Sequence, residues 1–270
     1  MILINGVAAE DVAATDRGLA YGDGVFRTLL LINARACNWQ LHYSKLAADC
    51  AALGIECPAN AVLADDLARL ANQSADAVIK IIITRGSGAR GYAPPQPASP
   101  TRIVLSTQRP DYPGEYADAG VEVRVCDTRL SFQPRLAGVK HLNRLENVLA
   151  RAEWSDRGVP EGVMLDVDGN AVGGTMTNLF IVENGTLVTP DLTRCGVAGV
   201  TRARIMQAAA RAGVRCREEL LPLARLLEAD ETVLVNSVIG VWRVRACQGR
   251  RWQDGSVSRR MREWLDDEGD

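Results

Sequence analysis

The stretch GVKHLNRLENVLARAEW (residues 138–154) places one lysine immediately before a predicted helix. Its apolar residues recur at the three- and four-residue steps of a helical stripe, at Leu142, Leu145, Leu149 and Ala152. Asn143 followed by Glu146 is the pattern of an N-cap with its capping-box partner. Lys140 precedes this cap and follows the apolar run 136–139, an unusual position for a solvated lysine.

A lysine amine acts as a nucleophile or a base only if part of it is neutral near pH 7. Its ordinary pKa is about 10.4, and burial or a neighbouring positive charge lowers it. The apolar run before Lys140, with His141 and Arg144 beside it, provides such an environment. Taken alone, this segment still favours a solvated surface lysine, so the rest of the chain has to distinguish the two interpretations.

The remaining sequence predicts short strands joined by tight turns, with helices between them. Asn-Gly or Asp-Gly pairs between apolar runs predict hairpin turns at 5–6, 168–169 and 184–185. Helices are predicted at 40–53, 61–72 and 200–212. Strands are predicted at 25–32, 77–84, 101–107, 121–126 and 232–236. This order indicates an α+β fold with antiparallel or mixed sheets.

The length of 270 residues suits two domains. The stretch QRPDYPGEYA (108–117), with two prolines and a glycine, is the best candidate for a linker. We therefore expect a smaller N-terminal α/β domain (1–107), the interdomain linker (108–117) and a larger C-terminal domain (118–270).

Composition narrows the class of function. The net charge is −2, from 31 basic and 33 acidic residues, which disfavours a nucleic-acid or membrane-surface binder. We also expect no membrane span and no secretory signal. The seven cysteines form no CxxC pair and the chain has only two histidines, so we expect no metal site and reduced thiols in the cytoplasm.

Three further features suggest a phosphate site. GVAGVTR (196–202) is a glycine-bearing loop that opens a helix, where free N–H groups and the Thr201 hydroxyl favour an anion. Ser237, at the end of an apolar strand, offers another hydroxyl, and Lys45 offers a positive charge. Each has an ordinary alternative: a capped loop, a strand end or a solvated lysine. Together with Lys140, they suggest pyridoxal 5′-phosphate (PLP) held as a Schiff base.

The chain resembles the class IV aminotransferase family, the fold-type IV PLP enzymes, over nearly its whole length. The resemblance is carried by the order and spacing of LINGV near the start, DRGLAYGDGVFRT (16–28), ITRGSGARGY (83–92), LAGVKHLNRLENVLAR (136–151), TNLFIVENGTLVTP (177–190), GVAGVTR (196–202) and VNS (235–237). Within the family, RGSGARGY and KHLNRLENV are most similar to the aminodeoxychorismate lyases. The resemblance implies a two-domain fold like that of the D-amino-acid aminotransferases, and a homodimer.

It also implies roles for individual residues. Lys140 would form the Schiff base with PLP and serve as the acid and base. The phosphate would contact Val200, Thr201, Ser237 and Val238. Lys45 stands where the family usually has an arginine, so it keeps the charge but lacks the bidentate guanidinium.

A second departure from the family pattern is Gly173. The family usually has a glutamate there that pairs with the pyridine nitrogen, whereas the segment AVGGTMTNLF contains no acidic residue. We therefore expect no carboxylate nearby, and expect water, Thr175 or Thr177 to contact the ring nitrogen. A transaminase must delocalise a carbanion through the cofactor ring. A lyase that expels enolpyruvate and forms an aromatic ring needs less of this delocalisation, because its leaving group accepts the electrons.

The implied reaction converts 4-amino-4-deoxychorismate to 4-aminobenzoate and pyruvate, a step of folate biosynthesis. Its substrate carries two carboxylates, for which arginines suit bidentate contacts. The candidates for substrate binding are Arg90, Tyr92, Arg27 and Arg144, with Arg85 in the same loop as Arg90. Two alternatives stay open: a D-amino-acid or branched-chain aminotransferase on the same fold, and a non-catalytic PLP-binding protein.

Overall fold

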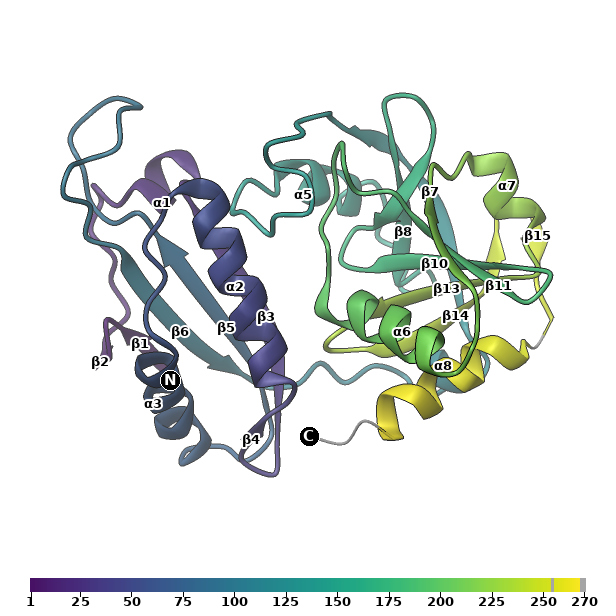
Figure 1. Ribbon diagram of the computed structural model, residues 1–270, viewed down its shortest axis with the longest axis horizontal. Coiled ribbons are helices and arrows are strands. Elements are labelled where there is room, and N and C mark those ends of the chain that lie inside the picture. The colour runs from purple at the N-terminus through teal and green to yellow at the C-terminus, as the bar shows by residue number, and fades with distance from the viewer. Residues whose placement is uncertain (254, 268–270) are drawn as a thin grey trace. The chain divides into compact units, whose positions relative to one another are not determined.

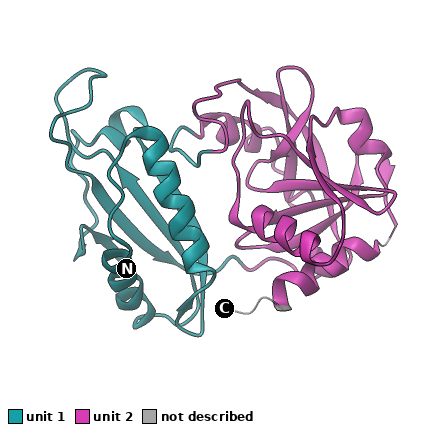
Figure 2. Cartoon of the chain, viewed as in Figure 1, with its two compact units in different colours: residues 1–110, 139–143, 270 teal, residues 111–138, 144–269 magenta. Residues whose placement is uncertain are grey.

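The computed structural model describes residues 1–253 and 255–267, which form two compact units. The first contains Met1–Pro110 and the separate segment Val139–Asn143 (Figure 2). The second contains Asp111–Gly138 and the chain from Arg144 onward. The predicted division at 108–117 stays a prediction. The structure adds a feature that the sequence did not indicate, because the short segment that carries Lys140 packs with the first unit.

The first unit is a sheet with two helices on one face (Figure 1). The strand order is β2-β1-β6-β5-β3-β4. The strands are β1 (Ile2–Ile4), β2 (Val7–Ala8), β3 (Gly24–Ile32), β4 (Arg35–Ala36), β5 (Ala77–Thr84) and β6 (Thr101–Thr107). The helices are α1 (Arg17–Tyr21), α2 (Trp39–Leu53) and α3 (Asn60–Ala71). Neighbouring strands of this sheet pair antiparallel, as the hairpin signals predicted.

Alternation along the strands builds the core of the first unit. The β-branched and aliphatic residues at every second position of β3 and β5 point toward α2 and α3, as side chains of a strand alternate between faces. The buried set includes Val25, Leu29, Leu31, Ile79, Ile81, Ile83, Leu46, Leu63, Leu67 and Leu70. The Asn5-Gly6 turn joins β1 to β2 with both residues at positive φ, as a type I′ turn requires.

The second unit contains a mixed sheet of order β12-β11-β10-β13-β14-β7-β8-β9, with β15 beside β14. Its strands are β7 (Val121–Leu130), β8 (Glu161–Asp166), β9 (Ala171–Gly174), β10 (Asn178–Glu183), β11 (Thr186–Pro190), β12 (Cys216–Glu219), β13 (Glu231–Asn236), β14 (Gly240–Cys247) and β15 (Arg250–Arg251). Parallel pairs (β7 with β8 and with β14, β11 with β12) accompany antiparallel hairpins. The predicted α+β class with mixed sheets is confirmed.

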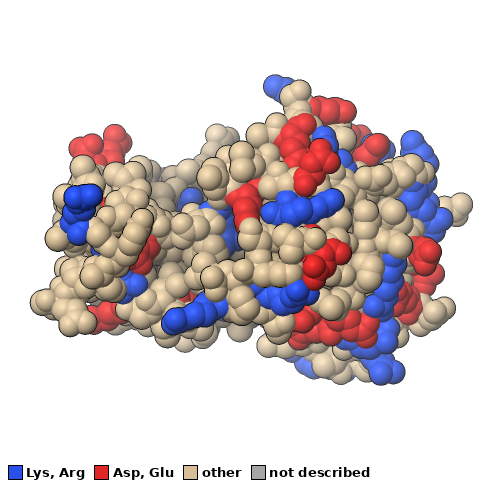
Figure 3. Space-filling model, turned by 90° about the horizontal axis from the view of Figure 1, so that it is seen from above, with Lys and Arg blue, Asp and Glu red and all other residues tan. Residues whose placement is uncertain are grey.

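Helices cover the second sheet and complete its cores. They are α4 (Glu115–Asp118), α5 (Leu145–Arg151), α6 (Val200–Arg211), α7 (Leu223–Glu228) and α8 (Ser256–Asp267). Ile205 of α6 and Met261 of α8 pack on Phe180 and Val235, while α7 contributes Leu226 to a separate core around Trp242. None of the described helices is long and apolar enough to cross a membrane. Acidic and basic side chains are interspersed on the face drawn in Figure 3.

The predicted capping box at Asn143 and Glu146 is wrong. Helix α5 begins at Leu145 with Arg144 as its N-cap. The Asn143 side chain instead donates to the carbonyl oxygen of Gly22, and Glu146 accepts from the N–H of Ser131. Hydrogen bonding to distant backbone therefore replaces local capping. The predicted apolar stripe is also largely exposed in the single chain, with Leu145 68% and Leu149 54% accessible.

Candidate active site

The segment around Lys140 lengthens the first sheet at its β3 side. The Phe26 N–H donates to the Lys140 carbonyl at 2.9 Å, and the Leu142 N–H donates to the Gly24 carbonyl at 2.9 Å. Val25 and His141 form the bridge between these bonds. The backbone of Lys140 is thus held as part of a sheet edge, whereas the sequence predicted only that Lys140 precedes a capped helix.

The amine of Lys140 lies over an aromatic ring. Its Nζ is 4.5 Å from the centroid of Phe26, and Nζ of Lys80 is 4.9 Å from the same centroid. Both contacts suit the negative face of the ring. The chain has three lysines in all, Lys45, Lys80 and Lys140. Two of them therefore share one phenyl ring, which places a second positive group in the neighbourhood of Lys140.

Asp49 of α2 connects the predicted site residues of the first unit. Its Oδ2 accepts the backbone N–H of Lys140 at 3.2 Å and also accepts from the guanidinium of Arg27. Its Oδ1 is 3.4 Å from Nζ of Lys45. Asp49 is 1% exposed and Arg27 is 2% exposed. No sequence motif singled out Asp49, although its place four residues after Lys45 puts both on one helix face.

The buried pair with Asp49 bears on the predicted role of Arg27. Burial lowers the pKa of Arg27, and the neighbouring Asp49 carboxylate opposes that change. An arginine so deeply buried and already paired holds α2 against β3. Its predicted contact with substrate stays a prediction, and the observed geometry supports a role in positioning Lys140 through Asp49.

In the second unit, Gly199 is the N-cap of α6, so Val200 and Thr201 lie in its first turn. Amides of that turn have no carbonyl partner within the helix. The Asn178 side chain fixes the approach to the helix, because Oδ1 accepts from the Gly199 N–H and Nδ2 donates to the Val197 carbonyl. A Cβ on Gly199 would lie 2.2 Å from that Oδ1, so the close approach requires glycine. The predicted binding of an anion by this helix start stays a prediction.

The hydroxyls of Thr201 and Ser237 lie 3.1 Å apart, so the structure brings together two residues 36 positions apart in the chain. The start of α6 and the end of β13 therefore lie next to each other. The N–H of Val238 donates to Oδ1 of Asn236 at 2.8 Å. Its predicted contact with phosphate stays a prediction.

The expectation of no carboxylate near Gly173 is wrong. Glu161, at the start of β8, is fully buried and accepts from the hydroxyls of both Thr175 and Thr177. It also accepts from the backbone N–H groups of Gly162, Thr175 and Met176. These donors supply the hydrogen bonds that a buried carboxylate needs. Because β8 pairs with β9, an acid twelve positions earlier in the chain reaches the turn after Gly173.

Backbone fills the space that a side chain at position 173 would need. A Cβ on Gly173 would lie 2.7 Å from the carbonyl oxygen of Thr177, whose partner is the N–H of Gly174. Glutamate at this position would therefore require the turn to move. Position 173 therefore departs from the family pattern in two ways: the turn lacks the negative charge, and it also lacks the space for a side chain.

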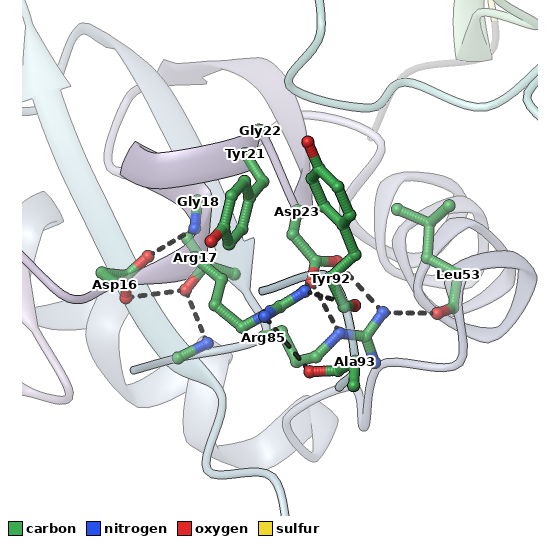
Figure 4. Close-up of polar contacts among 12 residues, drawn as sticks. Asp16, Arg17, Gly18, Tyr21, Gly22, Asp23, Leu53, Arg85, Tyr92 and Ala93 are labelled. Atoms are coloured by element: carbon green, nitrogen blue, oxygen red, sulfur yellow. Dashed lines mark hydrogen bonds and ion pairs between the residues drawn. The ribbon is translucent and has the colours of Figure 1, made fainter. Parts of the chain in front are cut away.

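The predicted substrate-binding residues fall into different settings. Arg90 and Tyr92 are exposed on the loop between β5 and β6, with Tyr92 85% accessible. Arg85, in the same loop, is buried and pairs with Asp23 (Figure 4). Arg144 lies in the second unit as the half-buried N-cap of α5. Arg85 thus has a structural partner, whereas Arg90 and Tyr92 face solvent.

Comparison with known proteins bears on the identity of this site. A family model described as amino-transferase class IV matches residues 24–247. An aminodeoxychorismate lyase from Vibrio harveyi is 35% identical over 241 residues, 89% of each chain. A putative branched-chain-amino-acid aminotransferase from Methanocaldococcus jannaschii is 30% identical and covers 98% of this chain and 95% of its own. The crystal structure of a 4-amino-4-deoxychorismate lyase from Pseudomonas aeruginosa is 45% identical, with a TM-score of 0.95, covering 99% of this chain and 98% of that one.

Proposed function

Because the chain belongs to the class IV aminotransferase family, we propose that it is a PLP-dependent lyase that converts 4-amino-4-deoxychorismate to 4-aminobenzoate and pyruvate. The observation that carries the proposal is the 45% identity to a lyase of this name across 99% of the chain. The placement of Lys140 supports it, because a sheet edge, Phe26 and Asp49 together fix this lysine.

The residues present fit PLP. Lys140 offers the amine for the covalent link. The first turn of α6 offers the amides of Val200 and Thr201 for the phosphate, beside the hydroxyls of Thr201 and Ser237. Because the N-cap residue 199 is a glycine, it has no side chain of its own to cap the amides of the first turn. We assign Lys45 to the phosphate as a point charge that Asp49 holds.

When bound, PLP supplies an electron-withdrawing ring conjugated to the nitrogen of the substrate. The residues of the chain then bind the substrate and transfer protons. The Nζ of Lys140 takes the proton from C4 of the substrate ring. The same Nζ returns a proton to the departing enolpyruvyl group, which leaves as pyruvate. The atoms of 4-aminobenzoate and pyruvate together equal those of the substrate, so the reaction needs no amino acceptor.

The aminotransferase alternative is favoured by one observation, the 30% identity to a putative branched-chain enzyme over 98% of the chain. The two activities differ in whether a keto acid is consumed. Purified PLP-loaded protein should release pyruvate and 4-aminobenzoate in equal amounts from 4-amino-4-deoxychorismate alone. Turnover that requires 2-oxoglutarate and an amino acid would show the alternative instead. Bound PLP without either activity would show a non-catalytic PLP protein.

We further propose that the protein is a homodimer. The face of the first sheet opposite α2 and α3 carries apolar side chains that are only partly buried in the single chain, including Ile4, Leu30, Ile82, Ile103 and Leu105. On α5 of the second unit, Leu145, Val148 and Leu149 are exposed. Apolar surface of this kind marks protein contacts. Sedimentation velocity at micromolar concentration would give twice the chain mass of 29.2 kDa, whereas a monomer would overturn this proposal.

The cytoplasm is the proposed location. All seven cysteines are free thiols, and Cys50, Cys126, Cys195 and Cys247 are buried. Unpaired thiols in this number suit a reducing compartment.

A further inference from the structure

The loop that carries Arg90 and Tyr92 is held by one buried arginine. Arg17, the first residue of α1, is 4% exposed. Its Nη1 donates to the carbonyl oxygens of Gly91 at 2.9 Å and Ala93 at 3.4 Å, and its Nη2 donates to that of Tyr92 at 3.0 Å (Figure 4). A single guanidinium therefore fixes three consecutive carbonyls of the turn that presents the predicted substrate-binding side chains.

The other side of Arg17 is anchored to the body of the unit. Its Nε donates to Oδ2 of Asp23 at 2.8 Å. Arg85 binds the same carboxylate through Nε at 2.8 Å and Nη2 at 3.0 Å, and also donates to the carbonyls of Leu53 and Gly54 at the end of α2. Burial alone would raise the pKa of Asp23, but the bonds and charges of Arg85 and Arg17 hold it below its usual value.

Tyr21 adds a second contact to the same turn. Its ring lies 4.9 Å from the guanidinium carbon of Arg17 and 5.4 Å from the ring of Tyr92. Its hydroxyl accepts from the N–H of Gly91 at 3.1 Å. Just after β5, the carbonyl oxygen of Gly86 accepts from the backbone N–H of Arg17 at 2.9 Å. The loop backbone is thus held near its start at Gly86 and again at Gly91–Ala93, while the side chains of Arg90 and Tyr92 are exposed.

We propose that Arg17 is a positioning residue for substrate binding, which fixes the Arg90–Tyr92 turn in the shape that receives a substrate carboxylate. This inference rests on the proposed function. A loop that is already ordered loses little further conformational entropy when the ligand binds. A bidentate contact with a carboxylate also requires a guanidinium held in a fixed position. Lysine at position 17 would present one point charge and could not serve three carbonyls and Asp23 together.

The kinetic test compares Arg17→Gln with the wild-type protein on 4-amino-4-deoxychorismate. KM should rise roughly five- to hundredfold, because Arg90 and Tyr92 must then be ordered by the substrate. The kcat, the PLP dissociation constant and the absorbance of bound PLP should stay unchanged, because Arg17 touches none of the proposed cofactor residues. Arg17→Lys should give an intermediate KM. The control is Arg35→Gln, on the exposed part of β4.

A double-mutant cycle tests whether Arg17 acts through Arg90. In Arg17→Gln/Arg90→Ala, the increase in KM should be clearly smaller than the product of the two single increases. Independent effects that multiply, or an unchanged KM in Arg17→Gln, would overturn the inference.

A trypsin assay measures how well the loop is ordered and does not depend on lyase activity. Cleavage of the Arg90–Gly91 bond, followed by mass spectrometry of the intact fragments, should be several-fold faster in Arg17→Gln than in the wild-type and Arg35→Gln proteins. Equal rates would overturn the holding role of Arg17. If the wild-type protein shows no lyase turnover, the proposed function and the substrate role of this turn both fail. The trypsin rates still decide whether Arg17 orders the loop.

Discussion

The backbone N–H of Lys140 donates to the carboxylate of Asp49, a residue 91 positions earlier in the chain. The same carboxylate pairs with buried Arg27 and lies 3.4 Å from Nζ of Lys45. Asp49 therefore connects the proposed covalent lysine to a proposed phosphate lysine. Its loss should affect the fold and the site together.

Asp49→Asn should lower the free energy of unfolding by about 3–5 kcal/mol, because it leaves the buried Arg27 without a negative partner. Urea unfolding followed by tryptophan fluorescence would measure the change. The matched control is Asp168→Asn, whose partner Arg194 is 38% exposed and whose own side chain is 53% exposed. That change should be below about 1 kcal/mol. Similar losses in the two variants would contradict the assignment of a buried pair.

Thr201→Val and Ser237→Ala should each weaken PLP binding roughly ten- to hundredfold. Each removes a hydroxyl that would bond to a charged phosphate, an interaction worth about 1.5–3 kcal/mol. Titration of the apoprotein with PLP, monitored by absorbance, gives the dissociation constants. Thr193→Val serves as the control, because its hydroxyl is exposed and, among the described residues, bonds to Asp191 alone. Unchanged PLP affinity in both site variants would remove α6 from the proposed phosphate site.

Gly173→Ala should destabilise the protein by about 1–3 kcal/mol, because its Cβ would press on the Thr177 carbonyl at 2.7 Å. Gly114→Ala is the control, since no atom lies within 4 Å of a Cβ there and the φ of −56° suits alanine. Thermal melting of both variants measures the difference. A Gly173→Ala protein as stable as the control would show that the turn adapts, so that a glutamate could be restored without a structural penalty.

Acid should weaken the Arg17–Asp23–Arg85 cluster. The pKa of Asp23 is lower in the folded protein than the roughly 3.9 of an unfolded aspartate. The stabilisation by its carboxylate is therefore complete above about pH 4 and is lost as the pH falls through the folded pKa. Asp23→Asn should remove this contribution, so its stability should fall less steeply than that of the wild type below about pH 4. Parallel stability curves from pH 5 downward would refute a depressed pKa.

Local patterns predicted most of the fold. The turn at Asn5-Gly6, the end of α2 at Gly54 and the β8–β9 and β10–β11 hairpins all depend on neighbours in sequence, and the structure contains each of them. The start of α5 depends on distant partners, since Asn143 bonds to Gly22 and Glu146 bonds to Ser131. A capping pattern depends on adjacent residues alone, so it does not show that distant backbone groups compete for the Asn143 and Glu146 side chains.

The site was predictable to the extent that it repeats family motifs. Thr201 and Ser237 do meet, whereas no motif indicated that Asp49 holds Lys140, that Glu161 lies beside the threonines, or that Arg17 binds the loop. Each of these three is a charged group buried by tertiary structure. Their partners are 91, 16 and 75 positions away in sequence, beyond the reach of any periodic pattern.

The most direct test of the account asks which lysine carries the cofactor. The chain has only Lys45, Lys80 and Lys140, so the assignment is a choice among three. The PLP-loaded protein is reduced with sodium borohydride, digested and analysed by peptide mass spectrometry. We predict that the phosphopyridoxyl mass is found on the peptide that contains Lys140, and that Lys140→Ala shows no labelled peptide and releases no pyruvate. A label on Lys45 or Lys80, or pyruvate release by Lys140→Ala, would contradict the account.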